Sequence, residues 1–196
     1  MWPASLALAR VLVHCPSFTA GRRCLEIGAG LGLVSIAACT AGAAEACPHG
    51  NPSTPRVGPD SKAAPRRLQV IAADRDPAAL RRIQASESLL PPGSGSLRSV
   101  LADWSTPCSD AWPTDVDVVL ASDVLYDADT ASQVAEVLAH VMAPSGKRSQ
   151  AFIADPEQRP NRDAFVRQVR SLGFDVGVSV LPGPERCVLL VCTRVS

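Results

Sequence analysis

The sequence lacks several features that mark common classes of protein. No apolar run approaches 18 residues, so no stretch is long enough to cross a membrane as a helix. The N-terminus has neither a basic segment nor a long apolar segment, which argues against a secretory signal. The formal net charge is +0, which argues against a broad basic surface for nucleic acid or for an acidic membrane.

Patterns typical of metal sites and disulfide frameworks are also lacking. The seven cysteines are an odd number, form no C-x-x-C pair, and in several cases lie in apolar runs. They are typical of reduced core residues in an intracellular protein. The three histidines are scattered, so no metal site is predicted. We expect the cytoplasm as the compartment, and the arginines near the N-terminus leave import into an organelle open.

Length and hydrophobic content predict one domain over residues 1–196, since 46% of the residues are hydrophobic. Residues 44–67 differ from the rest, because they hold five prolines and few apolar side chains. This segment is predicted to be a disordered insertion without a function of its own.

The most informative stretch runs from Arg23 to Cys39. A short apolar run is followed by glycines at every second position (Gly28, Gly30 and Gly32) and then by small apolar residues at helical spacing. This pattern predicts a buried strand, a tight turn and the start of a helix. Glycines let a ligand approach the bare backbone, and a helix start offers unpaired N–H groups.

The spacing of this turn differs from that of a dinucleotide site. The third glycine comes one residue earlier than in G-x-G-x-x-G, and Glu26 stands two residues before the first glycine. A carboxylate there favours a cationic ligand over a pyrophosphate. E-x-G-x-G-x-G resembles motif I of class I S-adenosylmethionine-dependent methyltransferases, whose ligand carries an ammonium and a sulfonium. The predicted cofactor-binding residues here are Glu26, Gly28, Ala29, Gly30 and Gly32.

Acidic residues follow the next two predicted strands. Asp74 ends the strand over residues 68–73 and is placed to bind ribose hydroxyls, although an acid there can also cap a helix. After the strand over 97–101, Asp103 is predicted to bind the exocyclic amine of adenine and Trp104 to lie against the ring. The alternative is a surface turn with a core tryptophan.

A second strong signal is DVDVVLASDVLY, residues 115–126. A buried strand over 116–120 places Ala121 and Asp123 at its carboxyl end, where α/β sheets bind ligands. Asp123 and Tyr126 are three residues apart and share a face if this segment forms a helical turn. Alternatively, Asp123 caps the next helix and Tyr126 packs. Trp2 either belongs to a helix that covers the sheet or closes over a cofactor.

The order of elements predicts an α/β fold. Strands and helices alternate five times, and Pro182-Gly183-Pro184 joins two last strands as an antiparallel hairpin. The fold class expected is a Rossmann-like class I methyltransferase, with a seven-stranded, mostly parallel sheet, an antiparallel last strand and helices on both faces.

The stretches MWPAS, LEIGAGLGLVSIAA, ADW and LASDVLYD resemble the family 16, seven-strand lysine methyltransferases. D-x-x-Y after the fourth strand is their hallmark, and IADPEQRP resembles the branch that methylates the electron transfer flavoprotein β-subunit. The resemblance implies S-adenosylmethionine as cofactor, a lysine of a protein as substrate, and Asp123 and Tyr126 as catalytic residues. It implies cofactor binding by Trp2, Gly28 to Gly30, Asp74, Trp104 and Ala121.

Two other functions stay open at this point. One is a small-molecule or nucleic-acid methyltransferase, although Ser122-Asp123-Val124-Leu125 stands where amide and adenine methyltransferases carry an N-P-P-Y-type motif. The other is an inactive or truncated scaffold that binds S-adenosylmethionine, since family members carry a segment before the tryptophan that this sequence lacks. A monomer without membrane or nucleic-acid partners is expected.

Overall fold

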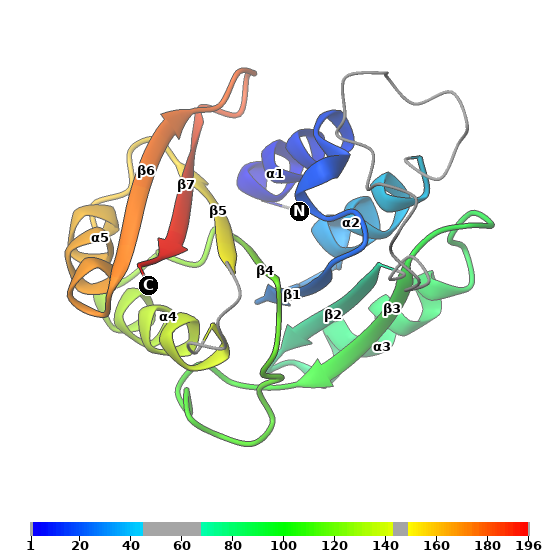
Figure 1. The fold of residues 1–196 in the computed structure, drawn as a ribbon, viewed down its shortest axis with the longest axis horizontal. Helices are drawn as coiled ribbons and strands as arrows, with labels where there is room; N and C mark the ends of the chain where they lie inside the picture. The colour runs from blue at the N-terminus through cyan, green and yellow to red at the C-terminus, as the bar shows by residue number, and fades with distance from the viewer. Residues whose placement is uncertain (1, 45–67, 143–148, 196) are drawn as a thin grey trace, which may run out of the picture.

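The structure, a computed structural model, describes residues 2–44, 68–142 and 149–195. They form a seven-stranded sheet with helices on both faces (Figure 1). The strands are β1 (Arg23–Ile27), β2 (Gln69–Asp74), β3 (Ser96–Leu101), β4 (Val118–Ser122), β5 (Gln150–Pro156), β6 (Phe174–Val180) and β7 (Cys187–Arg194). The helices are α1 (Pro3–His14), the short 3-10 helix η1 (Pro16–Phe18), α2 (Leu33–Ala44), α3 (Pro77–Glu87), α4 (Ala128–Val141) and α5 (Arg162–Ser171).

The sheet has the order β3-β2-β1-β4-β5-β7-β6. The first five strands are parallel, and β7 runs antiparallel to both β5 and β6. The predicted seven-stranded, mostly parallel sheet and the predicted hairpin are therefore confirmed. In this register Ile27, the last residue of β1, pairs with Ala73 on one side and Ala121 on the other. The carboxyl ends of the central parallel strands thus meet at one edge of the sheet.

The two faces of the sheet carry different helices because successive strand residues point to opposite faces. On one face Leu8 of α1 and Ile83 of α3 pack with strand residues such as Leu120, and α2 lies between them. On the other face Leu138 of α4 and Phe165 of α5 pack with residues such as Leu25. All six side chains are fully buried, so each face of the sheet packs against an apolar core.

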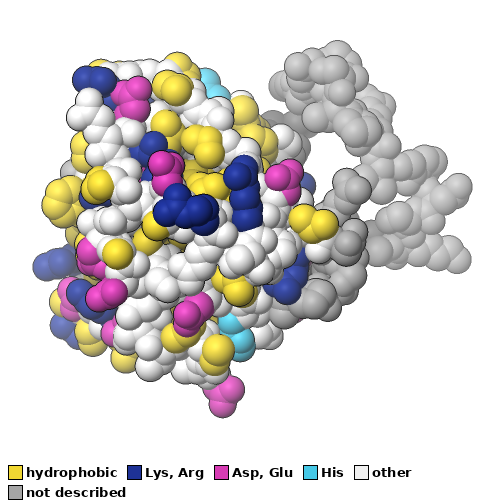
Figure 2. All heavy atoms as spheres, turned by 90° about the vertical axis from the view of Figure 1, so that its left-hand side faces the viewer, with side chains coloured by type: hydrophobic (Ala, Val, Ile, Leu, Met, Phe, Trp, Pro, Cys, Tyr) yellow, Lys and Arg dark blue, Asp and Glu magenta, His cyan; other side chains and the backbone are white. Residues whose placement is uncertain are grey.

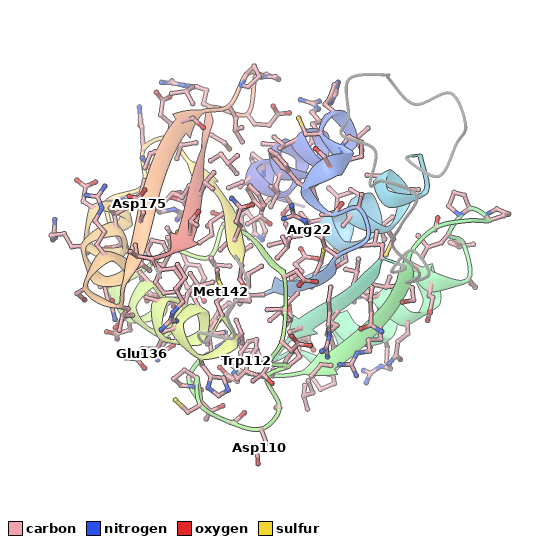
Figure 3. All side chains as sticks on the ribbon, in the orientation of Figure 1. Arg22, Asp110, Trp112, Glu136, Met142 and Asp175 are labelled. Atoms are coloured by element: carbon pink, nitrogen blue, oxygen red, sulfur yellow. The ribbon has the colours of Figure 1, made fainter. Side chains whose placement is uncertain are left out.

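The loop between β3 and β4 is fixed by its own tryptophan. Trp112 is buried in the core on the α4 side, and its Nε1 donates a hydrogen bond of 3.1 Å to the carbonyl of Thr106. Figure 3 shows Asp110 at the outer tip of this loop, whereas Trp112 lies nearer α4. The loop therefore returns to the sheet at a defined place.

Two aspartates determine where helices begin. Asp76 accepts a hydrogen bond of 2.8 Å from the amide of Ala78, and Pro77 follows as the first helical residue, so the predicted cap of α3 is confirmed. Asp127 accepts from the amide of Thr130 at 2.7 Å and caps α4, which begins three residues earlier than the predicted start at Ala131. The cap of this helix is therefore Asp127 and not Asp123.

The predicted insertion, residues 44–67, lies outside the described residues except for Ala44, the last residue of α2. Among the helices that the structure describes, none has the length and hydropathy to cross a membrane. Figure 2 looks onto the side formed by α5 and β6, where basic and acidic side chains both occur among apolar ones. The charge on this side is therefore mixed.

Candidate active site

A pocket of about 310 Å³ lies at the carboxyl edge of the sheet. It is lined by eight of the site residues predicted from sequence: Trp2, Gly28, Ala29, Gly30, Asp74, Trp104, Asp123 and Tyr126. These side chains and turns come from α1 and from the ends of β1, β2, β3 and β4. Four predicted residues, Glu26, Gly32, Asp103 and Ala121, do not line it.

The turn after β1 has the backbone that its glycines predict. Gly28 and Gly30 have φ values of 68° and 54°, in the left-handed region that favours glycine. A Cβ atom on Gly28 would lie 2.8 Å from Cζ3 of Trp104, so the indole packs directly on this residue. A Cβ atom on Gly30 would meet no heavy atom of the described chain within 4 Å, so its side toward the pocket is open.

Gly32 serves packing between helices. Its φ is 75°, and a Cβ atom there would lie 2.8 Å from Cγ1 of Ile83 in α3. Its carbonyl also accepts a hydrogen bond of 2.9 Å from the amide of Ile36, at the start of α2. The need for glycine at this position is thus explained by the approach of α3 to the start of α2.

Glu26 lies beneath the turn rather than in the pocket. It is buried, and its Oε2 accepts hydrogen bonds from the amide of Ser35, at 2.9 Å, and from the Ser35 hydroxyl. Burial raises the pKa of Glu26 to about 7, although the two bonds from Ser35 act in the opposite direction. The carboxyl group satisfies the N-terminus of α2, and any effect on a ligand would pass through the turn above it.

Asp74 connects the end of β2 with the glycine turn. Its Oδ2 accepts a hydrogen bond of 2.8 Å from the amide of Gly30, and its Oδ1 accepts one of 2.9 Å from the amide of Asp76. Each carboxylate oxygen retains a second lone pair, so both can still accept bonds from hydroxyl groups. Asp76, Ala79 and Arg82 also line the pocket, and their spacing of three residues places them on one face of α3.

Two aromatic side chains form one wall of the pocket. Trp104 and Tyr126 meet edge to face, with ring centroids 6.4 Å apart. The guanidinium carbon of Arg75 lies 5.9 Å from the centre of the Trp104 ring. Asp103 instead accepts a hydrogen bond of 2.9 Å from the amide of Ser105, which holds the pKa of Asp103 below its usual value.

Asp123 has an unusual backbone for a residue that is not glycine, with a φ of 59°. The segment after β4 is therefore not the helical turn that the spacing of Asp123 and Tyr126 assumed, although both residues line the same pocket. The amide of Asp123 donates to the carbonyl of Ala154 at 3.0 Å. Ala121 does not line the pocket and is instead buried in the apolar core on the α4 face of the sheet.

Asp123 also forms an ion pair with Arg159, from the loop after β5. Burial raises the pKa of Asp123, and the positive charge of Arg159 acts in the opposite direction. Because guanidinium groups stay charged, Arg159 favours the ionised form of this carboxyl group.

Two side-chain contacts at the site were also not predicted from sequence. The hydroxyl of Ser5 in α1 lies 2.9 Å from that of Ser122 at the end of β4, and both serines line the pocket. Arg159 contacts Asp123 across 36 positions of sequence. Ser5 and Arg159 lie in stretches that resemble the family, MWPAS and IADPEQRP, but no local pattern indicated the residues that they contact.

The chemistry of these residues fits S-adenosylmethionine. This ligand needs acceptors for its ribose hydroxyls, an aromatic surface for its adenine, and a backbone that it can approach closely. Asp74, Trp104 and Gly30 offer these, in that order, within one pocket. The volume lies at the lower end of the range for small-molecule sites.

Comparisons with known proteins agree with this chemistry. A family model described as lysine methyltransferase matches residues 67–171, more than half of the chain. No match was found among curated protein sequences.

Solved structures share the fold at low identity. A SAM-dependent methyltransferase from Aquifex aeolicus is 14% identical, with a TM-score of 0.66 over 98% of this chain and 94% of that one. Magnesium protoporphyrin IX methyltransferase from Synechocystis PCC 6803, solved with bound SAM, is 14% identical, with a TM-score of 0.63 over 97% and 78%. The N-methyltransferase NodS from Bradyrhizobium japonicum WM9, in complex with S-adenosyl-l-homocysteine, is 12% identical, with a TM-score of 0.63 over 98% and 86%. The chain belongs to the lysine methyltransferase family and is an S-adenosylmethionine-dependent methyltransferase.

Proposed function

We propose that the protein transfers a methyl group from S-adenosylmethionine to the side-chain amine of a lysine in a protein substrate. The observation that carries this proposal is that Asp123 and Tyr126 line the same pocket as the glycine turn and Asp74. An acid that can orient an amine thus stands beside residues that can hold the cofactor. The membership in the lysine methyltransferase family supports the same substrate class.

In this proposal the cofactor is held mainly by backbone and by two side chains. The turn from Gly28 to Gly30 allows a close approach, Asp74 accepts bonds from ribose hydroxyls, and Trp104 covers the adenine. Trp2 lines the pocket from the start of α1 and is 68% exposed, so it can cover the bound cofactor without being part of the core. When bound, S-adenosylmethionine would supply an electrophilic methyl group, carried on its sulfonium, for the lysine nitrogen.

The residues around the amine have separate tasks. Asp123 binds Arg159 through Oδ1, and no residue in the described ranges hydrogen-bonds its Oδ2. Oδ2 is therefore the atom we assign to the substrate amine. Tyr126 is 45% exposed at the mouth of the pocket, where its ring can pack along the alkyl chain of a lysine. Most of the rate should come from aligning the nitrogen with the methyl group.

The protonation state of the lysine limits the reaction. A free lysine amine has a pKa of about 10.4, and only its neutral form is a nucleophile. A pocket that removes the amine from water lowers this pKa, since burial disfavours the charged form. Asp123 then orients the amine through a hydrogen bond and need not remove the proton itself.

The experiment that tests this function uses purified protein and S-adenosylmethionine with a radiolabelled methyl group. The acceptors are the proteins, the total RNA and the small-molecule fraction of a heat-inactivated cell lysate, each supplied separately. After acid hydrolysis of the protein fraction, amino-acid analysis identifies the labelled residue. We expect label in Nε-methylated lysine.

Each other outcome would contradict the proposal in a different way. Label in the RNA or in the small-molecule fraction alone would assign the activity to another substrate class. Binding of S-adenosylmethionine without transfer to any fraction would indicate an inactive scaffold.

A further inference from the structure

We infer that Arg159 is a positioning residue for the transfer, which holds Asp123 toward the pocket and offsets its negative charge so that the bound lysine amine loses its proton more readily. This inference deepens the proposed function and rests on it for the identity of the amine. It assigns a task to the segment after β5, whose residues do not line the pocket.

The first step in the argument is the arrangement of charges. Four side chains alternate in sign from the pocket inward: Asp123, Arg159, Asp155 and Arg162. Arg159 forms an ion pair with Asp123 through Nη2, and its Nε lies 3.4 Å from Oδ1 of Asp155. Arg162 lies 3.5 Å from the other oxygen of Asp155.

The second step concerns how firmly this row is anchored. Asp155, at the end of β5, is fully buried, so its charge needs both arginines. Arg162 also donates to the carbonyls of Pro156 and Glu157, the latter at 2.8 Å. Arg159 therefore lies within ion-pair distance of a fixed acid on one side, although its Nε and Oδ1 of Asp155 do not form a hydrogen bond, and the side chain that it can position is Asp123 on the other.

The third step is the backbone of Asp123. Its φ of 59° is a strained conformation for a residue other than glycine. The hydrogen bond from the amide of Asp123 to the carbonyl of Ala154 and the ion pair with Arg159 both favour this conformation. In this conformation the carboxylate reaches Arg159 of the loop after β5, and 11% of the Asp123 side chain stays exposed.

The fourth step is electrostatic. An isolated carboxylate beside a lysine would stabilise the ammonium form and raise the pKa of the amine. A guanidinium paired with that carboxylate largely cancels the attraction, so Asp123 can orient the amine without retaining its proton. The other titratable or charged groups that face Asp123 are Asp155 and Cys187 from β5 and β7, Tyr126 from its own segment, and Asp74, Asp76 and Arg82 across the pocket.

The test compares Arg159→Met, which keeps the alkyl chain, with Arg159→Lys, which keeps the charge. Arg186→Met is the matched control, because Arg186 pairs with Glu157 of the same loop at 3.1 Å and is exposed. Thermal unfolding establishes that each variant folds. The pKa of Asp123 is then measured by carbon NMR of the carboxyl group over a pH titration, and this measurement requires no transfer reaction.

We expect the pKa of Asp123 to rise by about one unit or more in Arg159→Met, and to stay near that of the wild type in Arg159→Lys and Arg186→Met. An unchanged pKa of Asp123 in a folded Arg159→Met variant would overturn the inference. Because the titration is independent of activity, a failure to methylate lysine would count against the proposed function and would leave the titration decisive for Arg159.

The second measurement is the pH profile of methyl transfer to poly-L-lysine. In Arg159→Met the alkaline rise in rate should move to higher pH, since the amine keeps its proton longer beside an uncompensated carboxylate. Arg159→Lys should restore the position of the rise. A profile that is lowered in rate but not shifted would assign Arg159 a purely structural role.

Discussion

The amide of Gly30 donates a 2.8 Å hydrogen bond to the carboxylate of Asp74, and this bond joins the turn after β1 to the end of β2. Two neighbouring strands thereby present one surface to the pocket. The backbone that a ligand would approach and the acid that would bind its hydroxyls are positioned together, so a change in either should affect cofactor binding.

Removal of the Asp74 carboxylate should therefore weaken binding of S-adenosylhomocysteine. For Asp74→Ala we expect a loss of about 10- to 100-fold by calorimetry, the range that corresponds to one hydrogen bond to a charged group. Asp74→Asn, which can still accept a bond from Gly30, should lose less. Asp175→Asn, on the outer strand β6 (Figure 3), should bind as the wild type does. Wild-type affinity in Asp74→Ala would contradict the assignment.

Gly30 and Gly173 form a matched pair for testing the turn. Both have positive φ, 54° and 86°, and a Cβ atom on either would meet no described heavy atom within 4 Å. Alanine should cost about 1 kcal/mol of folding stability at each position, because the backbone strain is similar. Only Gly30→Ala should also lose cofactor affinity, since its Cβ would project into the pocket. Equal affinity in the two variants would remove Gly30 from the site.

The buried Glu26 should make stability depend on pH. Its pKa is raised from 4.5 to about 7, so the folded protein binds this proton more tightly than the unfolded chain does. The stability that comes from this proton is present at low pH and is lost as pH rises from about 4.5 through about 7, by up to about 3 kcal/mol.

Glu26→Gln, which is neutral at every pH, should therefore gain stability relative to the wild type across that window. Urea unfolding of both proteins at several pH values measures the difference. Glu136→Gln, on the exposed side of α4, controls for the removal of one negative charge. A constant difference between Glu26→Gln and the wild type at all pH values would show that Glu26 titrates normally.

The sequence was most informative where an apolar run ended in a polar residue. Asp74 and Asp123 each follow such a run, and Trp104 follows a third strand of mixed polarity. Because parallel strands end at one edge, the three side chains meet in one pocket. The glycine turn was predictable for the same reason. These features depend on short-range patterns and on the general geometry of α/β sheets.

Features that depend on contacts between distant segments were not predictable. Glu26 faces Ser35 because strand residues alternate in direction, and its carboxyl thus lies under α2 rather than beside the ligand. The pairing of Asp123 with Arg159 requires the register of β4 against β5. The start of α4 differs in kind, since Asp127 is an ordinary helix cap that the sequence could have indicated.

The most direct test of the account is Asp123→Ala, with methyl transfer and cofactor binding measured on the same preparation. Asp129→Ala, in the first turn of α4, is the control for loss of a nearby carboxylate. We expect transfer to lysine in lysate protein to fall by about 100-fold or more, because the amine is no longer oriented, while affinity for S-adenosylhomocysteine stays within a few-fold. Equal loss of transfer and binding, or transfer at the wild-type rate, would contradict the role proposed for Asp123.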